Sequence, residues 1–167
     1  MSSKSKEKFT FFYRTESPFS QWHPAVFTID GHSFQNAEQY MMYGKAMLFH
    51  DEQTAQRILQ AKHPREQKQL GREVQHFDKK QWQQHAKDIV YQGNQAKFTQ
   101  NPDLLEMLLA TAGTTLVEAS PTDTIWGVGL DEDNPLIRNR NTWKGTNWLG
   151  EVLTSLRDHL LQQQQEQ

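Results

Sequence analysis

Apolar residues recur at helical spacing between residues 36 and 49, and this stretch predicts the central helix of the chain. Asn36 is a favourable N-cap, and Gln39 stands three residues later, as in a capping box. Glu38 and Lys45 are separated by nearly two helical turns, so both point the same way. The face expected in the core carries Ala37, Tyr40, Met41, Gly44 and Leu48.

The remaining pattern predicts short strands and amphipathic helices. Strands are predicted over residues 9–14, 25–29, 32–34 and 114–118, with Asp30-Gly31 as a hairpin turn. Helices are predicted over residues 52–60, from Pro64 past Arg72, from the cap Asp78, from Asn101-Pro102 to Gly113, and over residues 148–161. Residues 120–146 form a long irregular stretch, which is often functional in a compact domain.

These elements predict one α+β domain, mostly helical with a small β-sheet, over residues 9–161. Residues 1–8 are expected to be a flexible tail and residues 162–167 a Gln-rich tail with nothing to pack against.

Composition then restricts the chemistry. Lys and Arg total 18 against 20 Asp and Glu, a formal charge of −2, so any polynucleotide would be gripped locally rather than by a basic surface. The absence of cysteine excludes disulfides, thiolate metal sites and a cysteine nucleophile. The histidines lack metal-ligand spacing and no phosphate-binding glycine loop is present, so neither a metal nor a cofactor is expected.

Targeting signals are also missing from the sequence. No apolar run approaches the roughly 20 residues of a membrane span, and the polar start lacks the apolar region of a signal peptide. The expectation is a soluble, cytoplasmic protein without a membrane partner.

Glu38 and Lys45 are open to two interpretations. They are either exposed charges whose stems cover their apolar neighbours, or the lining of a cleft. In a cleft, partial desolvation would raise the pKa of the carboxyl and lower the pKa of the amine, which suits proton transfer or nucleophilic attack.

A second set of polar and aromatic residues lies in the last third of the chain. Glu118 ends an apolar strand, and Asp123 precedes Trp126 in a turn whose glycines, Gly127 and Gly129, let the backbone approach a ligand. Aromatic faces beside carboxylates suit a flat base next to a reactive sugar bond.

Each candidate also has a simpler structural explanation. Trp82 lies on an apolar helix face and suits core packing, while Arg72 suits a solvated helix charge. Asp123 suits an Asx turn that fixes its own loop, and Asn147 suits the cap of the last helix.

The order and spacing of short motifs resemble the NADAR family of YbiA-like N-glycosidases, and they span nearly the whole chain. The matching pieces are Pro18-Phe19-Ser20 with Trp22, Asn36 to Tyr40 with Lys45-Ala46, Leu70-Gly71-Arg72 before Trp82, Ala96-Lys97-Phe98, Leu116-Val117-Glu118, Asp123 with Trp126 to Gly129, and Trp143 to Asn147 with Leu149-Gly150. Two departures are Gln21, where Asn is expected, and a segment from Asp131 to Asn141 longer than in the bacterial type.

The resemblance implies cleavage of a C–N bond between ribose and an exocyclic amine. The expected ligand is a small molecule containing ADP-ribose or a ribosyl phosphate, with ADP-ribosylated DNA or RNA as a further partner. Two enzymatic substrates stay open: ADP-ribosylated guanine, and phosphoribosylated aminopyrimidine intermediates of riboflavin synthesis. A non-catalytic reader of ADP-ribose is the alternative of another class.

The resemblance also assigns roles to residues. Glu38 is the expected general acid/base, Lys45 the amine nucleophile or positioning charge, and Asp123 a second carboxylate. Arg72 is expected on a phosphate, Trp82 and Trp126 against the base or ribose, and Asn147 on the sugar or phosphate. The remaining expected ligand contacts are Ser20, Trp22, Glu118, Gly127 and Gly129.

Overall fold

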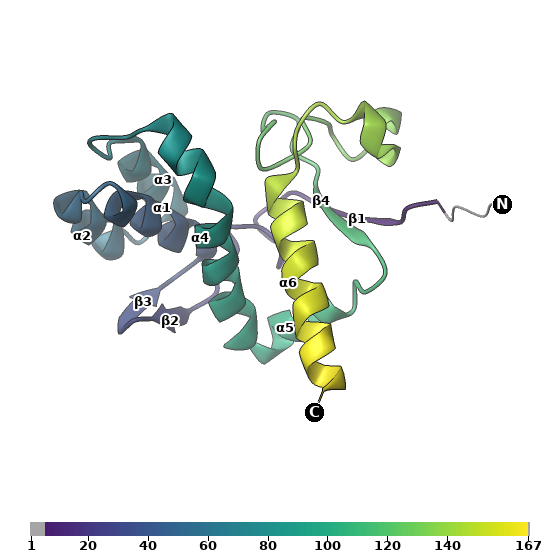
Figure 1. Ribbon diagram of the computed structural model, residues 1–167, viewed down its shortest axis with the longest axis horizontal. Coiled ribbons are helices and arrows are strands. Elements are labelled where there is room, and N and C mark those ends of the chain that lie inside the picture. Colours follow the sequence, from purple (N-terminus) through teal and green to yellow (C-terminus); the bar gives the residue numbers. More distant parts are fainter. Residues whose placement is uncertain (1–5, 167) are drawn as a thin grey trace. The chain divides into compact units, whose positions relative to one another are not determined.

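The computed structural model describes residues 6–166 and divides the chain into two compact units. Unit 1 is formed by Met1–Phe19 with Glu106–Gln167, and unit 2 by Ser20–Leu105. Figure 1 shows the elements of each unit along the chain.

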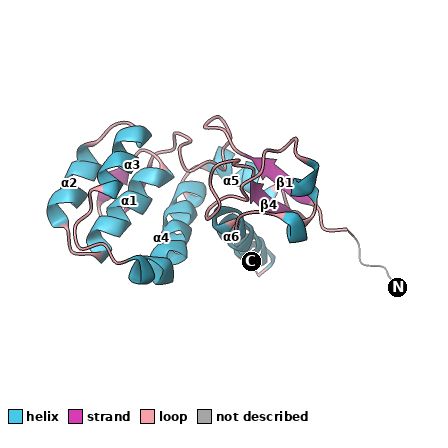
Figure 2. Cartoon of the chain, turned by 90° about the horizontal axis from the view of Figure 1, so that it is seen from above, coloured by secondary structure: helices cyan, strands magenta, loops and turns pink. Residues whose placement is uncertain are grey.

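Unit 2 begins with a hairpin and continues as four helices. Strands β2 (Phe27–Ile29) and β3 (His32–Phe34) pair antiparallel, and the turn residues Asp30 and Gly31 both have positive φ, as the sequence predicts. The helices are α1 (Ala37–Leu48), α2 (Glu52–Gln60), α3 (Pro64–Arg72) and α4 (Lys79–Thr99). Helix α1 packs against the other three, as Figure 2 shows, and is the central element of this unit.

The core of unit 2 joins the hairpin to the helices. Phe27, Phe34 and Tyr40 are buried in ring contact, with Ala96 of α4 beside them. The predicted core face of α1 is confirmed at Ala37, Tyr40 and Met41, whereas Gly44 and Leu48 are only half-buried. Helix α1 is therefore enclosed most completely over its first half, where Glu38 lies.

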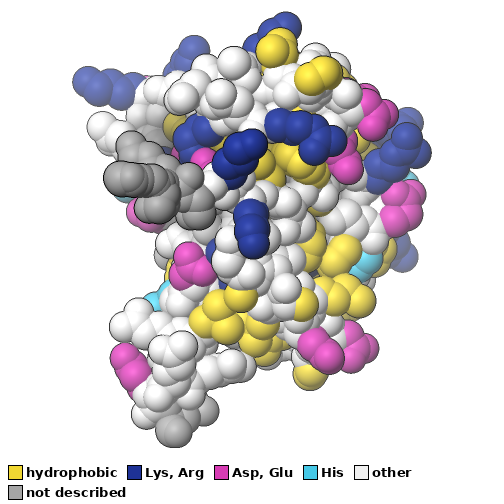
Figure 3. All heavy atoms as spheres, turned by 90° about the vertical axis from the view of Figure 1, so that its right-hand side faces the viewer, with side chains coloured by type: hydrophobic (Ala, Val, Ile, Leu, Met, Phe, Trp, Pro, Cys, Tyr) yellow, Lys and Arg dark blue, Asp and Glu magenta, His cyan; other side chains and the backbone are white. Residues whose placement is uncertain are grey.

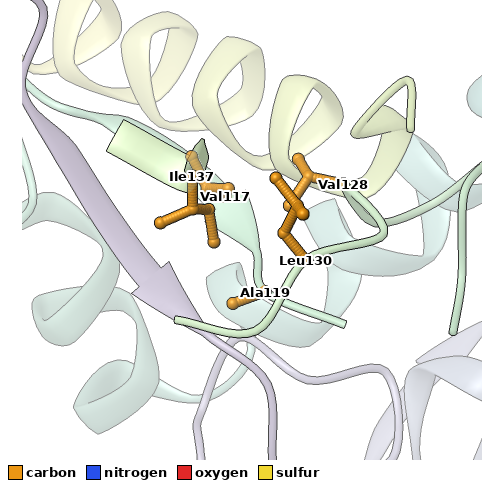
Figure 4. Close-up of a cluster of buried hydrophobic side chains, with 5 residues drawn as sticks. All are labelled: Val117, Ala119, Val128, Leu130 and Ile137. Atoms are coloured by element: carbon orange, nitrogen blue, oxygen red, sulfur yellow. The ribbon is translucent and has the colours of Figure 1, made fainter. Parts of the chain in front are cut away.

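Unit 1 is built on a parallel pair of strands. Strand β1 (Phe9–Phe12) pairs with β4 (Thr115–Glu118), and α6 (Trp148–Gln165) packs on β4. Figure 4 shows the core next to β4, formed by Val117, Ala119, Val128, Leu130 and Ile137. The boundary in the chain between Leu105 and Glu106 falls within helix α5 (Pro102–Leu109). Two short 3-10 helices, η1 (Pro135–Arg138) and η2 (Arg140–Thr142), interrupt the long irregular stretch.

The predicted α+β class is confirmed, and several boundaries change. The strands form two separate two-stranded sheets instead of one small sheet. Strand β1 ends at Phe12 because its partner ends at Glu118, and α3 ends at Arg72 instead of continuing past it. Helix α6 continues through Gln165, since glutamine is a good helix former. Most of the predicted N-terminal tail, residues 1–5, lies outside the described residues, as does Gln167.

Charges of both signs are interspersed on the surface. Figure 3 shows acidic and basic side chains close to one another on the face it displays, in keeping with the formal charge of −2. Over residues 6–166, no helix combines the length and the apolar character needed to cross a membrane.

Candidate functional site

The start of α1 is fixed by side-chain hydrogen bonds. The Asn36 Oδ1 atom accepts from the Gln39 backbone N–H at 2.8 Å, as the capping prediction requires. The reciprocal bond differs from a capping box, because Gln39 Oε1 accepts from Gln35 N–H at 2.7 Å. Gln39 Nε2 in turn donates to the carbonyls of Ile58 and Ala61 at the end of α2. The turn that carries Glu38 is thus held in place.

The burial of Glu38 and Lys45 argues against the interpretation of both as exposed charges. Glu38 is 7% exposed and Lys45 is half-buried. Burial lowers the pKa of the Lys45 amine, the nearby Glu38 carboxylate partly opposes this shift, and the positive charge of Arg72 adds to it. The side chains of Glu38, Lys45 and Arg72 therefore act on one another electrostatically within unit 2.

Two aromatic rings flank the amine of Lys45. Its Nζ lies 4.7 Å from the centroid of Phe77 and 5.9 Å from that of Trp82. Trp82 is half-buried beside this amine, which a purely core role would not require. Phe77 is 45% exposed, and no sequence pattern singled it out, because it lies in a connection just before α4.

The Ser20–Trp22 segment is bound to the helices of unit 2. Ser20 Oγ accepts from Trp22 N–H at 3.1 Å, and the Gln21 carbonyl accepts from Glu38 N–H at 3.0 Å. Gln21 Oε1 accepts from Asn94 Nδ2 of α4 at 2.9 Å. The residue that departs from the family pattern thus uses its longer side chain inside the protein.

Lys97 is a second unusual amine, which belongs to the matching motif Ala96-Lys97-Phe98 but is not among the expected site residues. Its side chain is 0% exposed, and burial lowers its pKa to about 7. The Nζ atom donates to the Ser20 carbonyl at 3.0 Å and lies 4.9 Å from the Phe98 ring. The signal in the sequence was its position on the apolar stripe of α4, four residues after Gly93.

In unit 1, the Asx-turn interpretation of Asp123 is confirmed. Its Oδ1 accepts from the N–H groups of Ile125 and Trp126 at 2.9 and 2.8 Å. The Trp126 ring meets the Trp148 ring edge-on, with centroids 5.5 Å apart. Asp123 therefore fixes the loop that carries Trp126.

The two glycines of this loop are explained by close chain packing and by conformation. A Cβ on Gly127 would stand 3.0 Å from the carbonyl oxygens of Asp123 and Glu118. Gly129 has a φ of 71°, which favours glycine. The protein's own backbone therefore accounts for both glycines. The half-buried Glu118 lies at the end of β4, and its carbonyl accepts from the Val128 N–H of this loop at 3.0 Å.

Asn147 is the N-cap residue of α6, as the cap interpretation places it, but its side chain makes no capping bond. The side chain is fully buried, its Oδ1 accepts from Glu118 N–H and its Nδ2 donates to the Leu116 carbonyl, both at 3.0 Å. Both polar atoms are therefore used to hold β4.

The structure brings the candidate residues together in two groups. In unit 2, Glu38, Arg72 and Trp82 surround the Lys45 amine, and Ser20 and Trp22 are linked to Glu38 through Gln21. In unit 1, one loop-and-strand network holds Glu118, Asp123, Trp126, Gly127, Gly129 and Asn147. Within residues 6–166, no three His, Asp or Glu side chains gather to hold a metal ion.

The model of the NADAR domain matches residues 11–161. The chain belongs to the NADAR family. A NADAR relative named N-glycosidase R617, from Acanthamoeba polyphaga mimivirus, is 41% identical over 91% of this chain and 96% of its own length.

Other relatives agree with the NADAR assignment. The NMR structure of the Escherichia coli protein YbiA matches with a TM-score of 0.79 and 28% identity, covering 98% of this chain and 90% of that one. A riboflavin biosynthesis protein, PYRR of Zea mays, is 36% identical over 64% of this chain, which corresponds to 16% of the maize protein. The relatives named N-glycosidase support N-glycosidase chemistry in this NADAR chain.

Proposed function

We propose that the chain is an N-glycosidase that removes ADP-ribose from the exocyclic amine of guanine, in guanosine or in nucleic acid. The observation that carries this proposal is the half-buried amine of Lys45, flanked by Phe77 and Trp82 and acted on by Glu38. A desolvated amine is neutral at lower pH than a solvated one, and only the neutral form is a nucleophile. An ADP-ribose reader has no need of such an amine beside a buried carboxyl.

The proposed reaction begins with opening of the ribose ring. Glu38 donates a proton to the ring oxygen as the C1–O bond breaks, leaving an iminium between C1 and the guanine nitrogen. The neutral Lys45 amine adds to C1, and the guanine amine departs with a proton returned through Glu38. Water then hydrolyses the resulting lysine imine, which releases ADP-ribose and restores the amine.

A direct route is the mechanistic alternative. Here Glu38 protonates the guanine nitrogen, the C–N bond breaks through an oxocarbenium-like state, and water adds to C1. Lys45 would then serve as a positive charge that positions the ribose. Both routes require Glu38 as the acid, and they differ in whether Lys45 forms a covalent bond.

The other candidate residues have proposed binding roles. Arg72 is exposed and suits bidentate recognition of a phosphate, while Trp82 would form a wall against the ribose or base. Asp123 retains its proposed role as a second carboxylate. Asp123→Asn tests that role, because asparagine also forms Asx turns while removing the charge. Unchanged turnover in this variant would restrict Asp123 to holding its loop.

The proposal is tested with ADP-ribosylated guanosine as substrate and chromatographic detection of free ADP-ribose. The wild-type protein is expected to release ADP-ribose, and Glu38→Gln is expected to lower kcat by at least about 100-fold. Binding without release would identify a reader and contradict the proposal.

Experiments on Lys45 distinguish the imine route from the direct route. Borohydride added during turnover is expected to trap a covalent ADP-ribosyl adduct on Lys45, and Lys45→Arg, which keeps the charge, is expected to be inactive. An active Lys45→Arg variant without a trapped adduct would favour the direct route.

The second candidate substrate is a phosphoribosylated aminopyrimidine of riboflavin synthesis. The similarity to the maize protein named for riboflavin biosynthesis favours it. Arg138 and Arg140 lie in the segment from Asp131 to Asn141 and could contact a larger, phosphate-rich substrate. Arg140, however, pairs with Glu7, and its Cζ lies 4.9 Å from the centroid of the Trp143 ring. Comparing kcat/KM for both substrates under the same conditions decides between them.

A further inference from the structure

Lys97 is a buried amine that the proposed reaction does not use. Its side chain is 0% exposed, and its Nζ donates to the Ser20 carbonyl at 3.0 Å. Burying an amine carries a desolvation cost that an apolar side chain of similar length, such as methionine, would avoid. An amine at this position therefore needs a reason other than filling space.

The bond made by Lys97 is one of two that join α4 to the Ser20–Trp22 segment. Asn94 lies one helical turn earlier on the same side of α4, and its Nδ2 donates to Gln21 Oε1 at 2.9 Å. Asn94 is also fully buried. Two successive residues of the segment are thus held by two buried side chains of one helix.

The same segment is bonded to the helix that carries the candidate acid. The Gln21 carbonyl accepts from the Glu38 backbone N–H at 3.0 Å. This N–H belongs to the first turn of α1, where backbone donors lack partners inside the helix. A shift of Gln21 would therefore reach Glu38 through a single hydrogen bond.

We propose that Lys97 is a positioning residue whose amine holds the Ser20–Trp22 segment so that Gln21 fixes the first turn of α1 and the Glu38 carboxyl. The amine has no exposed surface, so it does not reach a substrate itself. This inference rests on the proposed function, because it assigns Lys97 a role in the reaction of Glu38.

The absence of cysteine from the chain allows a matched chemical test. The single thiol of Lys97→Cys is alkylated in denaturant with 2-bromoethylamine, which restores a lysine-like amine, or with 1-bromopropane, which puts a methyl group in its place. Both products are refolded and compared with the wild type. Lys68→Met, which removes an exposed lysine of α3, serves as the control.

The aminoethyl form is expected to keep kcat within about threefold of wild type, whereas the propyl form should lose at least about tenfold, because small displacements of a reacting group are costly. KM should change less than kcat, since Glu38 acts on the bond that breaks. Equal kcat for the two alkylated forms would overturn the inference.

Hydrogen exchange gives a readout independent of turnover. In Lys97→Met, the Glu38 and Trp22 amides are expected to exchange at least about tenfold faster than in the wild type, while the amides of α2 keep their rates. In the control Lys68→Met, the Glu38 and Trp22 amides should exchange as in the wild type. Unchanged exchange at Glu38 would overturn the positioning role. If wild-type protein cleaves neither substrate, the proposed function fails, and exchange at Glu38 still shows whether Lys97 holds this turn.

Discussion

At the scale of single residues, Lys45 owes its properties to its surroundings. An ordinary lysine has a pKa of 10.5, and burial lowers this value for Lys45 despite the opposing carboxylate of Glu38. If the neutral amine attacks the sugar, kcat should rise with pH through this lowered pKa, because deprotonation creates the nucleophile. A pH profile of kcat measures this limb.

The positive charge of Arg72 provides a way to shift the rising part of the pH profile of kcat. Removing the positive charge in Arg72→Gln should raise the pKa of Lys45, since Arg72 contributes to lowering it. The limb should therefore shift to higher pH in this variant. If the rising part of the profile stays at the same pH in Arg72→Gln, another group titrates there, which would contradict the Lys45 amine as the titrating group.

Lys97 predicts a pH dependence of stability. Its pKa is about 7 in the folded protein against an ordinary 10.5, so between these values the unfolded chain holds a proton that the folded chain has released. The free energy of unfolding should therefore rise with pH in this window, by at most about 1.4 kcal/mol per pH unit from this group. Urea unfolding at several pH values measures this slope.

Lys97→Met is the reference for that measurement, because it removes the titrating group and leaves the others in place. The free energy of unfolding of the variant minus that of the wild type should be more positive at pH 7 than at pH 10. This difference should fall steadily as the pH rises. A constant difference across the window would mean that the Lys97 amine keeps an ordinary pKa.

At the scale of secondary-structure elements, Asn147 determines how β4 is held. Asn147→Leu is similar in size but leaves Glu118 N–H and the Leu116 carbonyl without the amide they bond. The loss should be about 2 kcal/mol, the usual cost of leaving buried polar groups unpaired. Urea unfolding measures it, with the exposed Asn141→Leu as a control expected within about 0.5 kcal/mol of wild type. Equal stability of both variants would contradict this role.

Local signals were sufficient to predict most elements. The N-caps Asn36 and Asp78, Pro64 at the start of its helix and the Asp30-Gly31 turn all act over a few residues, and all appear as expected. The pairing of β1 with β4 was not predicted, because it joins residues more than 100 positions apart. No local pattern specifies which distant strand completes a pair.

Those parts of the site that depend on local spacing could also be predicted. Glu38 and Lys45 share a helix, so their spacing alone indicated that they point the same way. Phe77 and Gln21 approach these residues only through packing between elements, and the bonds of Asn147 depend on the position of β4. Lys97 does carry a local sign, because it is a charged residue on the apolar stripe of α4.

At the scale of the whole molecule, net charge makes a prediction about nucleic-acid substrates. With a formal charge of −2 and charges of both signs interspersed, binding through many phosphates is not expected. A protein that neutralises 6 to 10 phosphates loses about 10³ to 10⁵ in affinity between 50 and 200 mM salt. For an ADP-ribosylated oligonucleotide, we expect kcat/KM to fall by less than about tenfold over this range, as for a contact with one or two phosphates.

ADP-ribosylated guanosine is the matched control for this salt series. It carries the same scissile bond without the flanking phosphates, so its kcat/KM should show nearly the same salt dependence as the oligonucleotide. A steep fall for the oligonucleotide alone would reveal an extended phosphate-binding surface and make nucleic acid the favoured substrate. A similar, shallow salt dependence for both substrates would mean that recognition is confined to the modified nucleotide. This outcome is expected for a site made of a half-buried amine and a buried carboxyl on one helix.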